Sequence, residues 1–203
     1  MRYQDYVIKD GKFVGEFEKM YQECDNPWHQ MEEADISYSR ADTVNSIHRF
    51  KLRNVLEAGC GLGYFTAYLA EHCHNVCITG MDISGTAIKK AKSNFPRLTF
   101  VQGDLSNLDG KMLERYDGII FSEIMWYILD NLDTILKKLK DVLGGGTLIV
   151  NQTFYKGGQQ YGREFFTNQD EMIQYIGWDV LAKTFAEIAD VPSSYETHTV
   201  FKI

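Results

Sequence analysis

The stretch Val55-Leu56-Glu57-Ala58-Gly59-Cys60-Gly61-Leu62-Gly63-Tyr64-Phe65 is the most specific feature of this 203-residue sequence. An apolar strand leads into a glycine-rich turn, and the turn opens a helix. Glycine lacks a Cβ atom, so it adopts positive φ angles and lets a ligand approach the backbone. The first N–H groups of the following helix are unpaired and lie at the positive end of its dipole. The stretch therefore predicts a strand–turn–helix unit that binds a nucleotide-type cofactor.

Downstream of this unit, apolar strands alternate with amphipathic helices. Further strands are predicted at 76–82, 98–101, 117–122 and 147–153. This alternation predicts a parallel sheet with right-handed crossovers and helices on both faces. The segments 178–185 and 197–203, joined by a turn around Pro192, predict an antiparallel hairpin at one edge. The expected fold is an α/β, Rossmann-like sheet of seven strands, mostly parallel, with a reversed last strand.

The first 50 residues are polar and are predicted to form a helical lid on a core at 51–203, within a single domain of 1–203. Phe13, Phe17, Met20 and Tyr21 recur at helical spacing and predict one amphipathic helix. The run Asp25-Asn26-Pro27-Trp28 interrupts it, because proline disfavours the helical conformation in the preceding residue. A second helix is predicted from about Ser39 to Phe50.

Charge and cysteine content restrict the function classes. The formal net charge of -7 argues against nonspecific binding to nucleic acid or to an anionic membrane. There is no apolar leader or bilayer-length apolar run, and the four cysteines lack C-x-x-C spacing, so we expect a cytoplasmic protein with reduced thiols. The cluster His72-Cys73-His74 with Cys77 offers a metal site as an alternative, but a helix end followed by a strand explains it better, and we expect no bound metal.

Polar residues and glycines follow the predicted strands, at the end of an open sheet where ligands bind. They are Glu57 and Gly59, Asp82, Gly103 and Asp104, and Ser122 and Glu123. The glycine spacing departs from G-x-G-x-x-G, because the third glycine comes only two residues after the second. Glu57 would repel a pyrophosphate. We therefore expect a cationic cofactor without phosphates, and an NAD-type oxidoreductase is the less favoured alternative.

These residues resemble, over 53–203, the motifs of class I S-adenosylmethionine-dependent methyltransferases. Glu57-x-Gly59-x-Gly61-x-Gly63 is similar to the first motif, and Asp82 to the acid that holds both ribose hydroxyls. Gly103-Asp104-Leu105 is similar to the third motif, which meets the adenine, and 116–123 to the fourth. The resemblance implies S-adenosyl-L-methionine as the cofactor and S-adenosyl-L-homocysteine as its product. The cofactor site that it implies consists of Glu57, Gly59, Cys60, Gly61, Gly63, Asp82, Ile83, Gly103, Asp104, Leu105, Ser122 and Trp28, with no chemistry assigned to the Cys60 thiol.

Two stretches, 25–28 and 122–127, are further similar to the small nodulation-type N-methyltransferases, which act on an amino group of a sugar. This resemblance implies lead-in helices that cover the cofactor and an aromatic residue beside the acceptor pocket. The candidates for catalysis or acceptor orientation are Glu123, Tyr127 and His29, and more remotely Tyr155, Tyr161 and Arg163. Ser122-Glu123 departs from the Asn/Asp-Pro-Pro-Tyr motif of enzymes that methylate nucleic-acid amino groups.

The expected reaction is methyl transfer to an amino or hydroxyl group of a sugar or related small metabolite. A neutral amine brings its own lone pair, whereas a hydroxyl also needs a base. The expected assembly is a monomer or homodimer, with neither nucleic acid nor membrane as a partner. A noncatalytic subunit of the same fold, which binds a ligand or a partner chain, is the alternative.

Plainer roles stay open for several of these residues. Glu57 could cap the amides of the turn, and Asp104 could serve a turn only. Glu123 could complement the positive end of a helix, and Trp28 could pack in the core. His198 is expected on the surface of the last strand.

Overall fold

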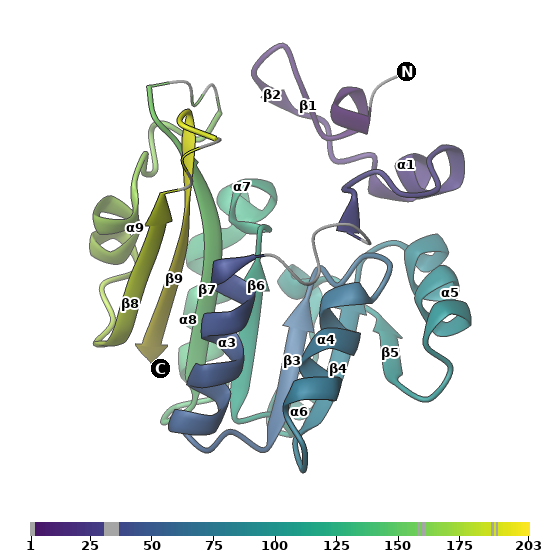
Figure 1. Cartoon of the computed structure of the whole chain (residues 1–203), viewed down its shortest axis with the longest axis vertical. Helices are drawn as coiled ribbons and strands as arrows, with labels where there is room; N and C mark the ends of the chain where they lie inside the picture. Colours follow the sequence, from purple (N-terminus) through teal and green to yellow (C-terminus); the bar gives the residue numbers. More distant parts are fainter. Residues whose placement is uncertain (1–2, 31–36, 158, 160, 188, 190) are drawn as a thin grey trace.

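A seven-stranded sheet organises the computed structural model, which describes residues 3–30, 37–157, 159, 161–187, 189 and 191–203. The strands lie in the order β5-β4-β3-β6-β7-β9-β8 (Figure 1). They are β3 (Asn54–Ala58), β4 (Cys77–Asp82), β5 (Thr99–Gln102), β6 (Gly118–Ser122), β7 (Thr147–Tyr155), β8 (Val180–Glu187) and β9 (Ser194–Lys202).

The strand pairing confirms the predicted topology. β5, β4, β3, β6 and β7 are parallel, while β9 pairs antiparallel with both β7 and β8. The last strand of the chain is therefore reversed, as predicted, and it lies between β7 and β8. The strand order changes direction between β3 and β6, which places the topological switch point beside the glycine-rich turn.

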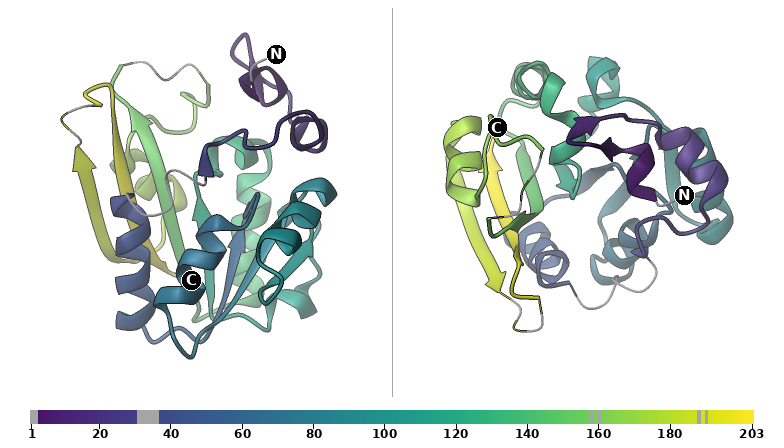
Figure 2. Two further views of the ribbon diagram at one scale, coloured as in Figure 1. Left: turned by 45° about the vertical axis from the view of Figure 1, so that its right-hand side comes forward. Right: turned by 90° about the horizontal axis from the view of Figure 1, so that it is seen from above.

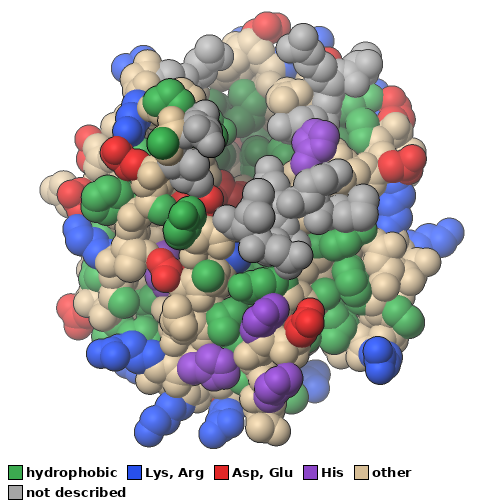
Figure 3. Space-filling view, in the orientation of Figure 1, with side chains coloured by type: hydrophobic (Ala, Val, Ile, Leu, Met, Phe, Trp, Pro, Cys, Tyr) green, Lys and Arg blue, Asp and Glu red, His purple; other side chains and the backbone are tan. Residues whose placement is uncertain are grey.

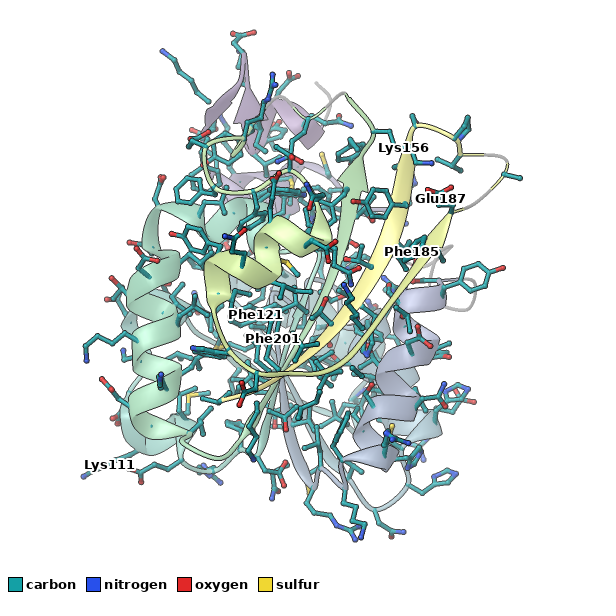
Figure 4. The ribbon with its side chains drawn as sticks, turned by 90° about the vertical axis from the view of Figure 1, so that its left-hand side faces the viewer. Lys111, Phe121, Lys156, Phe185, Glu187 and Phe201 are labelled. Carbon is teal, nitrogen blue, oxygen red and sulfur yellow. The ribbon has the colours of Figure 1, made fainter. Side chains whose placement is uncertain are left out.

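Helices cover both faces of the sheet (Figure 1). One face carries α3 (Tyr38–Arg49), α4 (Tyr64–His72) and α5 (Gly85–Asn94). The other carries α6 (Gly110–Leu113), α7 (Met125–Ile128), α8 (Leu132–Val142) and α9 (Gln169–Ile176), with the 3-10 turns η2 (Leu105–Asn107) and η3 (Leu129–Asn131). Phe121 and Phe201 are fully buried between the sheet and this second layer (Figure 4). No helix in the described ranges combines the length and the apolar character needed to cross a membrane.

The N-terminal segment lies above the carboxyl ends of the central strands (Figure 2). It contains η1 (Tyr3–Tyr6), β1 (Ile8–Lys9), β2 (Lys12–Phe13) and α1 (Phe17–Glu23). The prediction of one helix that includes Phe13 is wrong, because Phe13 belongs to a short hairpin. Asp10 and Gly11 both have positive φ, 51° and 71°, the conformation of a two-residue type I′ hairpin turn. The break after α1 agrees with the prediction, since the helix ends at Glu23.

His198 is buried, so the expectation of a surface position is wrong. It is 2% exposed, because β9 is an interior strand and α3 covers it. Its Nε2 lies 2.8 Å from Ser46 Oγ and its Nδ1 lies 2.8 Å from Asn151 Oδ1. Asn151 Nδ2 in turn donates to Thr43 Oγ1 at 2.8 Å. Burial lowers the pKa of His198 to about 4, so the ring is neutral at pH 7 and joins α3 to the sheet.

Candidate functional site

The glycine-rich turn is a left-handed loop that opens α4. Gly59, Gly61 and Gly63 have φ angles of 73°, 53° and 84°, which disfavour residues that carry a Cβ atom. Gly63 N donates to Cys60 O at 3.0 Å and closes the turn. A Cβ atom at Gly63 would lie 2.7 Å from Phe100 Cζ, so the loop packs tightly on the core. Burial raises the pKa of the Cys60 thiol, which makes it a packing residue without thiolate chemistry.

Asp82 ties this loop to the end of β4. Its side chain accepts from Gly61 N through Oδ2 and from Ser84 N through Oδ1, both at 2.9 Å. Asp82 is 6% exposed, and burial raises the pKa of its carboxyl to about 6. Each carboxylate oxygen has a second lone pair, so the group can also accept from two vicinal hydroxyls. Ile83, the next residue, is half exposed beside it.

Glu57 lies beneath the loop and is 2% exposed. Its Oε2 accepts from Thr66 Oγ1 at 2.5 Å, and burial raises the pKa of its carboxyl to about 7. The alternative that Glu57 caps the amides of the turn is wrong. The amides of Gly61 and Leu62 donate to Asp82 and to a glutamine of the lid instead.

The predicted adenine motif, Gly103-Asp104-Leu105, lies next to Asp82, and its described hydrogen bonds stabilise the local fold. Gly103 N donates to Asp82 O at 3.0 Å, which brings this turn to the site. Asp104 accepts from Ser106 N and from Asn107 Nδ2, both at 2.9 Å, and so caps η2. Leu105 is buried in the core. The structure thus gives Asp104 the turn role that the sequence left open, at the border of the site.

The N-terminal segment contacts the loop directly. Gln30 Oε1 accepts from Leu62 N at 2.9 Å, and Trp28 Nε1 donates to Tyr21 Oη at 3.0 Å. A Cβ atom at Gly61 would lie 2.6 Å from Tyr21 Oη. Trp28 therefore belongs to the segment 3–30 that rests on the loop, to which we refer as the predicted lid. Tyr21 and Gln30 are functional candidates that the sequence did not reveal.

Two polar clamps hold the lid helix α1 against α5. Glu18 accepts from Ser84 Oγ at 2.7 Å and from Thr86 Oγ1 at 2.6 Å, at the first turn of α5. These hydrogen bonds lower the pKa of Glu18 to about 2. Lys90 Nζ donates to Tyr21 O at 2.8 Å and to Cys24 O, which are carbonyls at the end of α1. Glu18 of α1 thus bonds the first turn of α5, and Lys90 of α5 satisfies carbonyl groups at the end of α1.

Glu123 lies at the end of β6 and points toward β7. Its φ of 58° is left-handed, which is uncommon for a residue with a side chain. The carboxylate accepts from Gln152 Nε2 at 3.0 Å and from Thr153 N and Oγ1 at 3.1 and 2.9 Å. The residue as a whole is exposed, yet protein around its carboxyl desolvates this group enough to raise its pKa to about 7. These contacts do not support the alternative that Glu123 complements the positive end of α7.

Gln152 is a second polar group at this position that the sequence did not reveal. It is fully buried, and its amide is oriented by donation to Glu123 and to Thr153 O. Its Oε1 has no hydrogen-bond partner among the residues that the structure describes. Glu196 adds negative charge, because its carboxylate raises the pKa of Glu123. Beside the donors that bind Glu123 there are thus one unpartnered acceptor, Gln152 Oε1, and the negative charge of Glu196.

Aromatic rings gather around Tyr127, one of the predicted site residues. The Tyr127 ring centroid lies 5.4 Å from that of Phe17, 5.7 Å from Trp28 and 6.4 Å from Phe13. Phe13 also stacks on Tyr161 at 6.2 Å. Figure 3 shows a recess at the top of the molecule, in the orientation of Figure 1, with hydrophobic side chains in its wall.

Other candidates lie apart from this group. His29 is exposed, and its described hydrogen bond is made by its backbone to Asn26 O. Tyr155 and Arg163 line a separate hollow with Lys156 and Thr167. Ser122 ends β6 and is half-buried. Within the described ranges, no group of three or more potential ligands is placed to hold a metal ion.

Comparisons with known proteins show that part of the chain is similar to methyltransferases. Residues 55–146 match a family model described as a methyltransferase domain. Malonyl-[acyl-carrier protein] O-methyltransferase of Priestia megaterium is 33% identical over 106 residues, which are 51% of this chain and 37% of that protein. Trans-aconitate 2-methyltransferase of Deinococcus radiodurans is 27% identical over 124 residues, 61% of this chain and 46% of that protein. The matched part thus spans less than half the length of either relative.

Among solved structures, the N-methyltransferase NodS from Bradyrhizobium japonicum WM9, in complex with S-adenosyl-L-homocysteine, has a similar fold. The TM-score is 0.66 at 18% identity, and the match covers 91% of this chain and 97% of NodS. The strand order and this likeness show that the chain has the Rossmann-like fold of class I S-adenosylmethionine-dependent methyltransferases. Within that class its fold is similar to that of NodS.

Proposed function

We propose that this chain binds S-adenosyl-L-methionine at the glycine-rich loop and transfers the methyl group to an amino or hydroxyl group of a small molecule, such as a sugar or related metabolite. The observation that carries the proposal is the buried Asp82 carboxylate, which is fixed by Gly61 and Ser84 at the switch point of the sheet. The site fits this cofactor chemically, because its carboxylates suit ribose hydroxyls and a sulfonium cation. Asp82, the loop and Gly103 would hold the nucleoside, and the cofactor would supply an activated methyl group.

The groups around Glu123 support an acceptor that donates hydrogen bonds. Glu123 and the unpartnered Oε1 of Gln152 both accept, and Glu196 adds negative charge nearby. These groups favour N–H or O–H donors and disfavour a carboxylate acceptor. The two curated relatives named above differ in this respect, since malonyl and aconitate groups carry carboxylates. In this proposal the acceptor is therefore an amine or an alcohol, without nucleic acid as a partner.

The residues of the chain would align the acceptor and keep water away from it. Alignment of two reactants can supply roughly 7–11 kcal/mol of the barrier reduction, which corresponds to effective molarities of about 10⁵–10⁸ M. Glu123 would orient the acceptor and take a proton from it, and a pKa of about 7 suits a base that works near neutral pH. Tyr127 and the rings packed on it would exclude water. We propose cytoplasmic action as a monomer or homodimer.

Calorimetric titration with S-adenosylmethionine and S-adenosylhomocysteine tests the cofactor assignment. We expect binding of both, and weaker binding by Asp82→Asn but not by Asp179→Asn, a matched change at an exposed acid. A panel of amino sugars, sugar phosphates and small amines, followed by S-adenosylhomocysteine release, tests the acceptor. Binding without turnover on any acceptor would support the noncatalytic alternative, and binding of NADH in place of S-adenosylmethionine would overturn the proposal.

A further inference from the structure

The outer edge of the sheet is an exposed strand that no part of the proposed reaction uses. β8 lies last in the strand order and, among the described residues, pairs with β9 alone. A strand at a sheet edge presents backbone N–H and C=O groups to which a further strand can pair. A register shift between Val180 and Ala182 disturbs the start of β8, whereas 183–187 pairs regularly with β9. Residues 183–187 therefore form a regular edge that another strand could extend.

This edge carries an exposed aromatic side chain. Phe185 is 66% exposed, and its ring meets that of Tyr195 edge-on, with 6.4 Å between the centroids. Figure 4 shows Phe185 and Glu187 along β8, on the side of the molecule that faces the viewer. A hollow of about 400 Å³ lies beside the ring and is lined by Gln169, Asp170, Lys183, Thr184 and Phe185. No proline interrupts 183–187, so the segment lacks a common device that prevents edge pairing.

The charges of this edge make the strand complementary to itself. Lys183 and Glu187 lie two residues on either side of Phe185, so the three side chains point to the same face of the strand. In antiparallel pairing about a two-fold axis at Phe185, Lys183 of each copy lies opposite Glu187 of the other. Opposite charges directly across two strands stabilise the pairing, as do two aromatic rings that meet at the axis.

The present partners of these charges leave them available. Lys183 Nζ lies 2.7 Å from Asp170 Oδ1, at the start of α9. Glu187 Oε1 lies 2.9 Å from Lys156 Nζ, just after β7. Both ion pairs are exposed to solvent, where such pairs contribute little to stability, so they can rearrange at small cost.

The edge is also held in place from both faces of the sheet. Thr184 Oγ1 donates to Asp42 of α3, and Thr184 O accepts from Gln169 Nε2 of α9 at 3.0 Å. Gln169 is buried, and its amide donates to His198 O of β9 as well. A preorganised strand loses less conformational entropy when it pairs, which favours association.

We propose that 183–187 of β8 pairs antiparallel with the same segment of a second copy of this chain, about a two-fold axis at Phe185, so that the two sheets become continuous. A strand of another protein would need the same spacing of base, aromatic ring and acid, whereas a second copy supplies it by symmetry. The contact is closed, because each copy uses the same edge, so association stops at the dimer.

Sedimentation velocity over a concentration series tests whether this edge holds two copies together. We expect wild type to form a dimer. Phe185→Lys places two like charges opposite each other at the axis and should weaken the dimer roughly ten- to hundredfold, as for an aromatic residue at the centre of an interface. Val14→Lys is the matched control, since Val14 is an exposed apolar residue of the N-terminal segment, at 40%. Its dimer should be as stable as that of wild type.

Disulfide cross-linking tests the register and does not depend on the stability of Phe185→Lys. Both variants carry Cys77→Ser, because Cys77 is an exposed native cysteine. In Phe185→Cys the two new cysteines lie directly opposite, with Cα atoms about 4.5–5.5 Å apart, which a disulfide can bridge. In Lys183→Cys they lie four residue steps apart along the strands, roughly 13 Å, which it cannot. A mild oxidant should therefore cross-link Phe185→Cys quickly and Lys183→Cys slowly.

Several outcomes overturn the inference. A wild-type chain that stays monomeric into the millimolar range leaves the edge to a different occupant. A dimer that Phe185→Lys does not weaken, or equal cross-linking of the two cysteine variants, places the contact elsewhere or in another register. Assemblies that grow beyond the dimer exclude a closed two-fold contact. None of these measurements uses a ligand, so their failure leaves the proposed function unchanged.

Discussion

Substitution of Gly61 by alanine measures how firmly the lid rests on the cofactor loop. Gly61 has a φ of 53°, and a Cβ atom there would lie 2.6 Å from Tyr21 Oη and 2.7 Å from Gln30 Oε1. Gln30 is flexible, but Tyr21 is 3% exposed and is held by Trp28. The methyl group therefore displaces a buried ring and the acceptor of the Leu62 amide.

Gly157→Ala is the matched control for backbone strain. Gly157 has a φ of 72°, and a Cβ atom there would have no heavy atom of the described residues within 4 Å, its chain neighbours aside. An alanine in the left-handed region costs about 1–2 kcal/mol of folding free energy at either position. Stiffening of the unfolded chain offsets part of this cost equally in both variants. The difference between the two variants therefore isolates the contact with the lid.

We expect Gly61→Ala to lose more stability than Gly157→Ala. Displacing Tyr21 costs about 1–3 kcal/mol, as for an overpacked core, and losing the hydrogen bond from Leu62 to Gln30 costs about 0.5–1.5 kcal/mol. The two costs together predict a difference of about 1.5–4.5 kcal/mol. Urea unfolding measures it for the whole fold, and limited proteolysis within 3–30 detects release of the lid alone. S-adenosylhomocysteine affinity should fall in Gly61→Ala only, and equal stability, proteolysis and affinity in the two variants would refute a lid packed on the loop.

Three further predictions concern titratable groups. Asp82→Ala should weaken S-adenosylhomocysteine binding by about 1.5–3 kcal/mol for each charged hydrogen bond lost, and unchanged calorimetric affinity would show that the ribose assignment is wrong. Glu123→Gln should lower turnover more than cofactor affinity. Because the pKa of Glu123 is raised to about 7, wild-type kcat/KM should rise with pH through that value. The same pH profile in Glu123→Gln would exclude Glu123 as the base. His198 has a pKa lowered to about 4 from 6.5, so its contribution to stability is present above pH 6.5 and is lost as pH falls toward 4. Urea unfolding of wild type against His198→Gln should show this difference, and parallel stability curves would contradict it.

The parts of this fold that local sequence determines were predictable. Serine and asparagine are residue types that typically begin helices, and the side chains of Ser84 and Asn168 each accept from a backbone N–H of the first turn. The glycines of the turn permit the positive φ angles that it needs, so a turn before α4 could be predicted from these residues alone. Phe13 shows where a pattern misleads, because helical spacing of aromatics outweighed Asp10-Gly11, a hairpin signal present in the same stretch.

The residues that complete the site depend on contacts between distant segments, which no local pattern contains. Gln30 lies in a polar stretch of the first 50 residues, and it reaches the loop only because the segment that follows α1 packs on Leu62. Gln152 has an ordinary position in a strand, and its role arises because Glu123 folds back toward β7. The expectation of a surface position for His198 was wrong for the same reason, because its burial depends on the place of β9 between β7 and β8.

The lid and the glycine-rich turn are parts of one hydrogen-bonded system. Ser84 donates its backbone N–H to Asp82 and its hydroxyl to Glu18 of the lid helix. Asp82 in turn accepts from Gly61, the residue on which the lid side chains rest. A ligand that displaces the lid from Gly61 therefore meets a helix still clamped at Ser84, whereas loss of the Glu18 clamp leaves Gly61 and Asp82 bonded to each other. The hydrogen bonds that fix the Asp82 carboxylate are thus separate from those that hold α1 against α5.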